Sequence, residues 1–217
     1  MDLLAQCVDV VMHLDMHVDI LIQSSGLWIY AILFAVIFAE TGLVVTPFLP
    51  GDSFLFVLGA FAARGSLQLI PLTGLLIFAA VLGDSVNYSI GKYFGHWLLK
   101  ARLPFFKKEY LAKTHRFFEK YGGKTIVLAR FIPIVRTFAP FVAGMASMRY
   151  PRFFTYNVIG GIAWIVILMG SGFLFGNMKT VKEHFSLITF IIIFLSICPA
   201  IIEWYRSRRS LDPVPSK

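Results

Sequence analysis

The sequence predicts an all-α integral membrane protein, built as an inverted repeat of two re-entrant helical hairpins plus transmembrane helices. Three observations predict this fold. Hydrophobic residues make up 58% of the 217 residues and charged residues 15%, whereas a soluble domain has about 25% charged residues. Long apolar stretches alternate with basic segments, and prolines and charges interrupt two of these stretches. With only two cysteines, this composition excludes a disulfide-stapled module, and it also excludes a disordered chain.

The charge is distributed unevenly along the chain. Residues 1–90 contain one cation and seven acids, whereas residues 91–217 contain 19 cations and five acids. A nucleic-acid-binding protein can be this basic, but here the cations flank apolar stretches, as they do in the cytoplasmic loops of membrane proteins. We therefore expect the basic segments to be cytoplasmic and expect no nucleic-acid partner. The acidic N-terminus does not resemble a cleaved signal peptide.

The first half of the chain is predicted to contain an interfacial helix, a hairpin and one crossing. Residues 1–25 have the pattern of an amphipathic helix at the membrane surface. Residues 26–63 are too long for one helical crossing and slightly too short for two. Helix breakers near the middle of this stretch predict that the chain turns back there, and they are Pro47, Pro50 and Gly51. Residues 69–90 can span the membrane once and complete a first half that ends at residue 95.

The second half, residues 125–205, follows a basic connector at residues 96–124 that we expect in the cytoplasm. It is predicted to contain a hairpin at 125–148, interrupted by Pro133 and Pro140, and crossings at 153–175 and 185–202, before a basic tail at 206–217. Because the connector and the tail are both basic, an even number of crossings should separate them. The two clear crossings satisfy this rule, so residues 125–148 should enter and leave on the same side.

The two halves resemble each other. Each has a proline-broken hairpin followed by a span that ends in Gly-x-x-x-Gly, with Gly91 and Gly95 in one half and Gly172 and Gly176 in the other. Because one crossing separates the hairpins, they should enter from opposite faces. Transporters with such inverted repeats bind their substrates near the midplane, where broken helices meet. The glycine pairs themselves favour close helix packing.

Four charged residues lie within the predicted hairpins, and they are Glu40, Asp52, Arg130 and Arg136. An ionised side chain at the centre of a membrane helix costs about 2.5–3.5 kcal/mol, so we expect the hairpin tips to meet and the acids to pair with the arginines. The proline breaks allow both guanidinium groups to converge on one ligand, and arginine donates paired hydrogen bonds to phosphate. Carboxylates in apolar surroundings can take up protons near neutral pH. This pattern predicts a site that carries an anion together with protons.

Each charged residue also has a purely structural interpretation. Asp52 can cap the second limb of its hairpin, and Arg130 can extend to the membrane interface. Glu40 and Arg136 can belong to an ion pair that only stabilises the fold. Two polar residues of the span at 69–90, Asp84 and Asn87, are secondary site candidates, and Asp84 can instead be a polar contact within the helix bundle.

Two long segments resemble the signatures of a known family. Residues 38–53 resemble the first signature of the DedA family and residues 123–145 the second, while 83–91 and 157–160 also fit. These bacterial inner-membrane proteins are distantly similar to the VTT-domain lipid scramblases of eukaryotes. The resemblance implies opposed re-entrant hairpins and a multi-pass location in the bacterial inner membrane. It places the family's acidic pair on Glu40 and Asp52, and its arginine pair on Arg130 and Arg136.

The resemblance also implies a function, namely transport of polyprenyl-phosphate lipid carriers. It points to undecaprenyl phosphate recycling, to dependence on a proton or sodium gradient, and to a role in envelope integrity. The expected partners are therefore membrane lipids, polyprenyl phosphate and H⁺ or Na⁺, with a second copy of the chain as a further candidate partner.

Other functions are compatible with the sequence. A proton- or sodium-coupled transporter of small ions would use the arginines only to balance charge. A lipid phosphatase would need a nucleophile and a proton donor, but the five histidines lie at or outside the predicted membrane edges. A structural assembly factor would need no transport site. We expect no enzyme, no cofactor and no metal, because the pair His13 and His17 has no evident third ligand.

Overall fold

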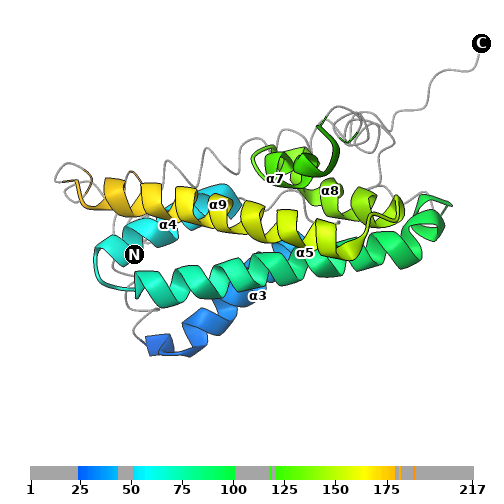
Figure 1. The fold of residues 1–217 in the computed structure, drawn as a ribbon. Helices are drawn as coiled ribbons and strands as arrows, with labels where there is room; N and C mark the ends of the chain where they lie inside the picture. Colours follow the sequence, from blue (N-terminus) through cyan, green and yellow to red (C-terminus); the bar gives the residue numbers. More distant parts are fainter. Residues whose placement is uncertain are drawn as a thin grey trace, which may run out of the picture.

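The computed structural model describes residues 24–43, 51–100, 118, 121–178, 181 and 188, and this part of the chain is helical throughout its regular elements (Figure 1). The elements in order are α3 (Trp28–Gly42), α4 (Gly51–Ala63), α5 (Leu69–Lys100), η1 (Gly122–Lys124), α7 (Thr125–Ala129), α8 (Pro133–Met145) and α9 (Tyr150–Gly176). The predicted helix at 1–25, most of the connector, the crossing at 185–202 and the basic tail lie almost entirely outside the described residues.

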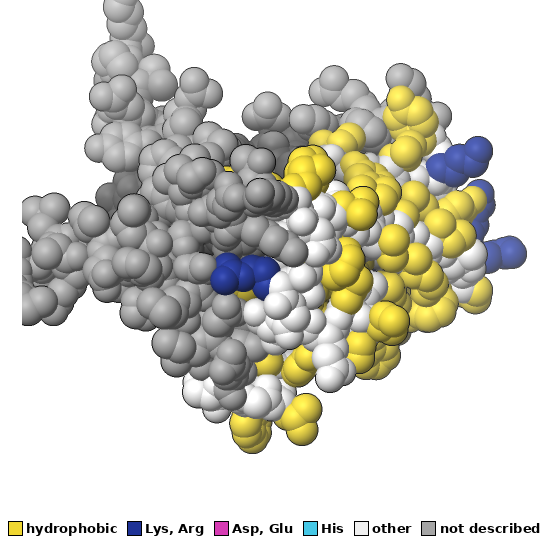
Figure 2. Space-filling view, turned by 90° about the vertical axis from the view of Figure 1, so that its left-hand side faces the viewer, with side chains coloured by type: hydrophobic (Ala, Val, Ile, Leu, Met, Phe, Trp, Pro, Cys, Tyr) yellow, Lys and Arg dark blue, Asp and Glu magenta, His cyan; other side chains and the backbone are white. Residues whose placement is uncertain are grey.

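Two long apolar helices, α5 and α9, lie side by side and antiparallel (Figure 1). Leu69–Gly95 and Tyr150–Gly176 are each 27 residues long, enough to cross a membrane. Only 39% and 33% of their most apolar windows are buried inside the protein. Figure 2 shows hydrophobic side chains over much of the described part of one face. The described part of the chain is all-helical, as predicted, and the exposed apolar faces of these two helices are suited to contact with lipid.

The first hairpin consists of α3 and α4. Gly51 begins α4 as predicted, whereas Pro47 and Pro50 lie outside the described residues. The backbone N–H of Gln68, just before α5, donates to the Tyr30 hydroxyl near the start of α3 at 3.2 Å. The start of α3 and the chain that follows α4 therefore lie together, so the segment formed by these two helices turns back on itself. Helix α3 packs on α5, and α4 packs on α9.

The second hairpin consists of α7 and α8. Ile126 near its beginning and Met148 just beyond its end pack in the same hydrophobic cluster as Phe153, so this segment also turns back. Pro133 is at the first position of α8, where a proline fits because that N–H has no helical partner. The predicted break at Pro140 is wrong, because α8 continues through this residue. The neighbouring side chains at 138, 141 and 142 are buried, and this packing compensates for the lost backbone hydrogen bond.

The glycines of α9 allow α4 to pack backbone to backbone. A Cβ at Gly172 would lie 1.9 Å from the carbonyl oxygen of Phe56, and one at Gly59 would lie 2.1 Å from that of Met169. The other half makes the same contact between α8 and α5. A Cβ at Gly91 would lie 2.1 Å from the carbonyl oxygen of Phe141, and one at Gly144 would lie 2.0 Å from that of Tyr88.

These two contacts are related by a constant shift in sequence. In the short helices, residues 56 and 59 correspond to residues 141 and 144, each 85 positions later. In the long helices, residues 88, 91 and 95 correspond to 169, 172 and 176, each 81 positions later. The packing therefore repeats: the first limb of each hairpin packs on the long helix that follows it, α3 on α5 and α7 on α9, and the second limb packs on the other long helix, α4 on α9 and α8 on α5.

The bases of the two hairpins lie at opposite ends of the spanning part of α5. The first is beside Gln68, and the second is beside Tyr88, whose hydroxyl donates to the carbonyl of Met148. These positions are about 30 Å apart along a helix, which matches the hydrocarbon thickness of a membrane. Entry of the hairpins from opposite membrane faces stays a prediction that fits this spacing. Helix α5 itself continues to Lys100, beyond the predicted crossing at 69–90, and α8 packs against it at Gly91 and Gly95.

Candidate functional site

The tips of the two hairpins meet at Arg136, in the first turn of α8. Its Nη1 donates to Asp52 and its Nη2 to Glu40. Glu40 comes from the end of α3 and Asp52 from the start of α4. The side chains of Glu40 and Arg136 are 2% and 11% exposed, whereas that of Asp52 is 42% exposed. Asp52 is therefore the accessible partner in this group.

Gly51 explains how the carboxylate of Glu40 fits beneath α4. A Cβ at this position would lie 2.0 Å from Glu40 Oε2, closer than any real contact. Gly51 thus both begins α4 and leaves room for the buried acid.

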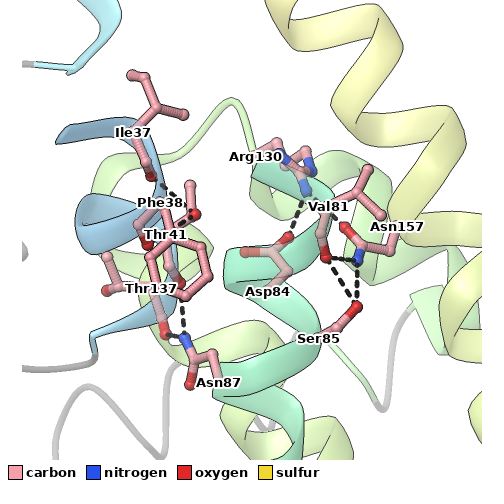
Figure 3. Close-up of polar contacts among 10 residues, drawn as sticks. All are labelled: Ile37, Phe38, Thr41, Val81, Asp84, Ser85, Asn87, Arg130, Thr137 and Asn157. Carbon is pink, nitrogen blue, oxygen red and sulfur yellow. Dashed lines mark hydrogen bonds and ion pairs between the residues drawn. The ribbon is translucent and has the colours of Figure 1, made fainter. Parts of the chain in front are cut away.

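Arg130, in the turn between α7 and α8, forms a second ion pair. Its Nη2 donates to Asp84 of α5 and to Asn157 Oδ1 of α9 (Figure 3). The Asn157 amide donates in turn to the carbonyl oxygen of Val81 at 3.0 Å. Arg130 and Asp84 are 4% and 5% exposed, so this group holds the second hairpin to both long helices and has little access to solvent.

The neutral side chain of Asn87 links the two hairpins through hydrogen bonds. Its amide donates to the carbonyl oxygens of Thr41 at 3.2 Å and Thr137 at 2.9 Å (Figure 3). Because Thr41 belongs to α3 and Thr137 to α8, this side chain of α5 fixes the two hairpins relative to each other.

Trp164 of α9 contacts both charged groups. Its indole Nε1 donates to Asp52 Oδ1 at 2.9 Å. The guanidinium carbons of Arg136 and Arg130 lie 5.2 and 5.8 Å from its ring centroid, within range of cation–π attraction. Sequence reasoning missed this residue. A signal was present, since Trp164 lies in the middle of a span, whereas tryptophan in membrane proteins is enriched at the interfaces.

A small cavity lies between the two ion pairs. It has room for about one water molecule, and its lining consists of Glu40, Thr41, Asp84, Arg130, Arg136, Thr137 and Trp164. A phosphate group is larger than this space.

The structure separates the two arginines that the sequence predicts on one ligand. Arg136 contacts Glu40 and Asp52, whereas Arg130 contacts Asp84, a secondary candidate that proves to be a direct ion-pair partner. Asp52 lies in the first turn of α4, but its carboxylate binds Arg136 and Trp164. Within the described ranges there is no group of three or more side chains suited to a metal ion.

Comparison with known proteins identifies the class. The VTT domain family matches residues 49–174. The chain is 49% identical over 213 residues to Protein DedA of Escherichia coli K12, covering 97% of both chains. It is 42% identical over 189 residues to an uncharacterized membrane protein of Mycobacterium tuberculosis, covering 83% of both. It is 33% identical over 162 residues to the inner membrane protein YqjA of Escherichia coli K12, covering 72% of this chain and 71% of that protein.

The protein is therefore a VTT-domain membrane protein. Within that class, the chain belongs to the DedA family, as its two signature segments predict. No solved structure is detectably similar to it.

Proposed function

We propose that this protein is a flippase that carries a polyprenyl-phosphate lipid, such as undecaprenyl phosphate, across the bacterial inner membrane. The observation that carries the proposal is the double carboxylate contact of Arg136 at the junction of two broken helices. Both terminal nitrogens of this guanidinium already bind anionic oxygens, and the same fork suits a phosphate. One of the two carboxylates is accessible and can be displaced.

The charge of the site supports coupling to protons. Three acids and two arginines form its ion pairs, so the group carries one net negative charge when all five are ionised. A phosphate adds further negative charge, which is costly in apolar surroundings. Protonation of Glu40 or Asp52 as the phosphate enters would offset this cost. Lipid transport would then respond to a proton gradient, with a sodium gradient as the alternative driving force.

The exposed apolar faces of α5 and α9 support a lipid substrate. Side chains such as Ile70, Phe78, Val166 and Leu174 are exposed and would contact the hydrocarbon of the membrane. A polyprenyl tail can remain in that environment while only the phosphate crosses at the charged site. Recycling of such a carrier would support the integrity of the cell envelope.

A second candidate is a proton- or sodium-coupled transporter of small ions. The size of the cavity favours it, because a species no larger than a water molecule fits without displacing a carboxylate. In this alternative the arginines only balance charge.

Reconstituted liposomes distinguish the two candidates. The purified protein should accelerate translocation of labelled polyprenyl phosphate across the bilayer under a pH or sodium gradient, relative to protein-free liposomes. Absence of acceleration under any imposed gradient would reject the flippase. Gradient-driven ion flux that persists without the lipid, followed with a pH- or sodium-sensitive dye, would support the small-ion transporter instead.

A further inference from the structure

We propose that Trp164 is a second donor to the lipid phosphate, and that Asp52 Oδ1 marks the position that a phosphate oxygen takes when it displaces this carboxylate. The inference rests on the proposed function and adds a residue to its binding site. It implies that the Asp52 carboxylate competes with the substrate phosphate for the donors Arg136 and Trp164.

The geometry around one oxygen atom carries the inference. Asp52 Oδ1 accepts hydrogen bonds from Arg136 Nη1 and from Trp164 Nε1, the latter at 2.9 Å. The two donors come from α8 and α9, and Trp164 is 2% exposed. The acceptor is the accessible member by comparison, because the Asp52 side chain is 42% exposed at the first turn of α4. Displacement of Asp52 would leave a preformed pair of donors.

The indole N–H restricts what can replace the carboxylate. It is a donor only, so it binds an acceptor oxygen and repels a cation. A buried donor that loses its acceptor is costly, so loss of Asp52 alone would be unfavourable. A phosphate oxygen restores both hydrogen bonds, whereas a lipid alcohol offers no anionic oxygen to Arg136.

The indole ring also holds Arg136 in position. The guanidinium carbon of Arg136 lies 5.2 Å from the ring centroid, so cation–π attraction remains when Asp52 leaves. The ring and the N–H of Trp164 thus keep the donors ordered, which lowers the entropic cost of binding.

A competing interpretation is that the indole N–H only positions Asp52. The two interpretations predict opposite effects of Trp164→Phe, which removes the N–H and keeps an aromatic ring. If the N–H only holds Asp52, its loss weakens the internal competitor, and a lipid phosphate should bind equally well or more tightly. If the N–H contacts the phosphate, binding should weaken.

The decisive experiment removes Asp52 first. In purified Asp52→Ala protein, the probe farnesyl phosphate should bind more tightly than in wild type, and farnesol should bind much more weakly than the phosphate. Adding Trp164→Phe in this background should weaken farnesyl phosphate binding by about tenfold or more, the effect of a lost hydrogen bond to a charged group. Trp28→Phe is the matched control, because Trp28 is 77% exposed at the start of α3.

A second measurement keeps the test valid if the Trp164 variant does not fold. Trp28, Trp97 and Trp204 can be changed to phenylalanine, which leaves one indole whose ¹⁵N-labelled N–H resonance is then unique. In the Asp52→Ala background this resonance should shift with farnesyl phosphate and stay unchanged with farnesol.

The outcomes separate the two proposals. If the Asp52→Ala protein binds farnesyl phosphate no better than farnesol, both the flippase proposal and this inference fail. If it binds the phosphate selectively, yet neither Trp164→Phe nor the indole resonance responds, the inference about Trp164 is overturned and the flippase proposal survives.

Discussion

Arg136 and Arg130 have the same side chain but different surroundings, and this difference separates their roles. Arg136 shares its two terminal nitrogens between two carboxylates, one of them accessible. Arg130 is enclosed by Asp84 and Asn157, and a Cβ at Gly160 would lie only 3.0 Å from its Cδ. We therefore propose that Arg136 exchanges its carboxylate for a ligand and that Arg130 holds the helices together.

Arg136→Lys should reduce lipid transport by about tenfold or more, because a lysine keeps the charge but loses the planar fork. Translocation of labelled polyprenyl phosphate into liposomes measures the effect, with expression and thermal unfolding as checks on folding. Normal transport in this variant would mean that only the charge matters, which favours the small-ion transporter.

Glu40→Gln should keep lipid-phosphate binding but lose the response to an imposed pH gradient, because glutamine resembles the permanently protonated acid. Asp52→Asn is the matched comparison at the accessible acid. If Glu40→Gln keeps full gradient-driven transport, Asp52 becomes the coupling candidate. If both variants keep it, proton coupling through this acid pair is wrong.

Asp84→Asn should lower the free energy of unfolding by about 3–5 kcal/mol, because it leaves the buried Arg130 without its counter-charge. Chemical or thermal unfolding in detergent measures the change. The double variant Arg130→Met, Asp84→Leu should recover much of the loss, since no unpaired charge remains. A double variant less stable than Asp84→Asn alone would contradict the role proposed for Arg130.

At the scale of elements, backbone contact between short and long helices holds the two halves together. The contact between α4 and α9 and that between α8 and α5 use glycines at corresponding positions. Helices in a membrane gain little from hydrophobic burial against each other, so close approach at small residues is a main source of their attraction. A side chain added at one of these glycines should therefore destabilise the protein to a similar extent in either half.

Gly172→Ala and Gly91→Ala should each destabilise the protein by about 1–3 kcal/mol through overpacking, since the new Cβ would meet a carbonyl oxygen of the facing helix. Gly170→Ala in α9 and Gly74→Ala in α5 are matched controls, with nothing within 4 Å of the added Cβ. These controls should be neutral or slightly stabilising, because alanine favours a helix more than glycine does. Equal melting temperatures for all four variants would contradict the packing repeat.

At the scale of the whole molecule, the hairpin bases lie at opposite ends of the spanning part of α5. After replacement of Cys7 and Cys198, single cysteines near Arg149 and in the 100–120 connector should be labelled from the same, cytoplasmic side. A cysteine at Gln68 should be labelled from the other side. Labelling of the first two from opposite sides would show that residues 125–148 cross the membrane, and the inverted repeat would be wrong.

Much of the architecture could be predicted from the sequence, because insertion of a segment into the membrane depends on its length and its residue composition. Uninterrupted apolar length predicted α9 within a few residues at each end, and Gly51 and Pro133 marked where α4 and α8 begin. The break expected at Pro140 was wrong, because α8 continues through this residue and its neighbours are buried in the interior. Such tertiary contacts support a proline inside a helix, and the local sequence does not contain them.

The sequence by itself determined the membrane class, the family and the residues that carry charge into the apolar interior, because each follows from residue types and their order along the chain. The partners of those charges were decided only by the tertiary structure. Arg130 and Arg136 are six positions apart, yet they pair with acids from different helices and share the ring of Trp164. Such pairing depends on how two hairpins and two long helices pack, and residues far apart in sequence are brought together by that packing alone.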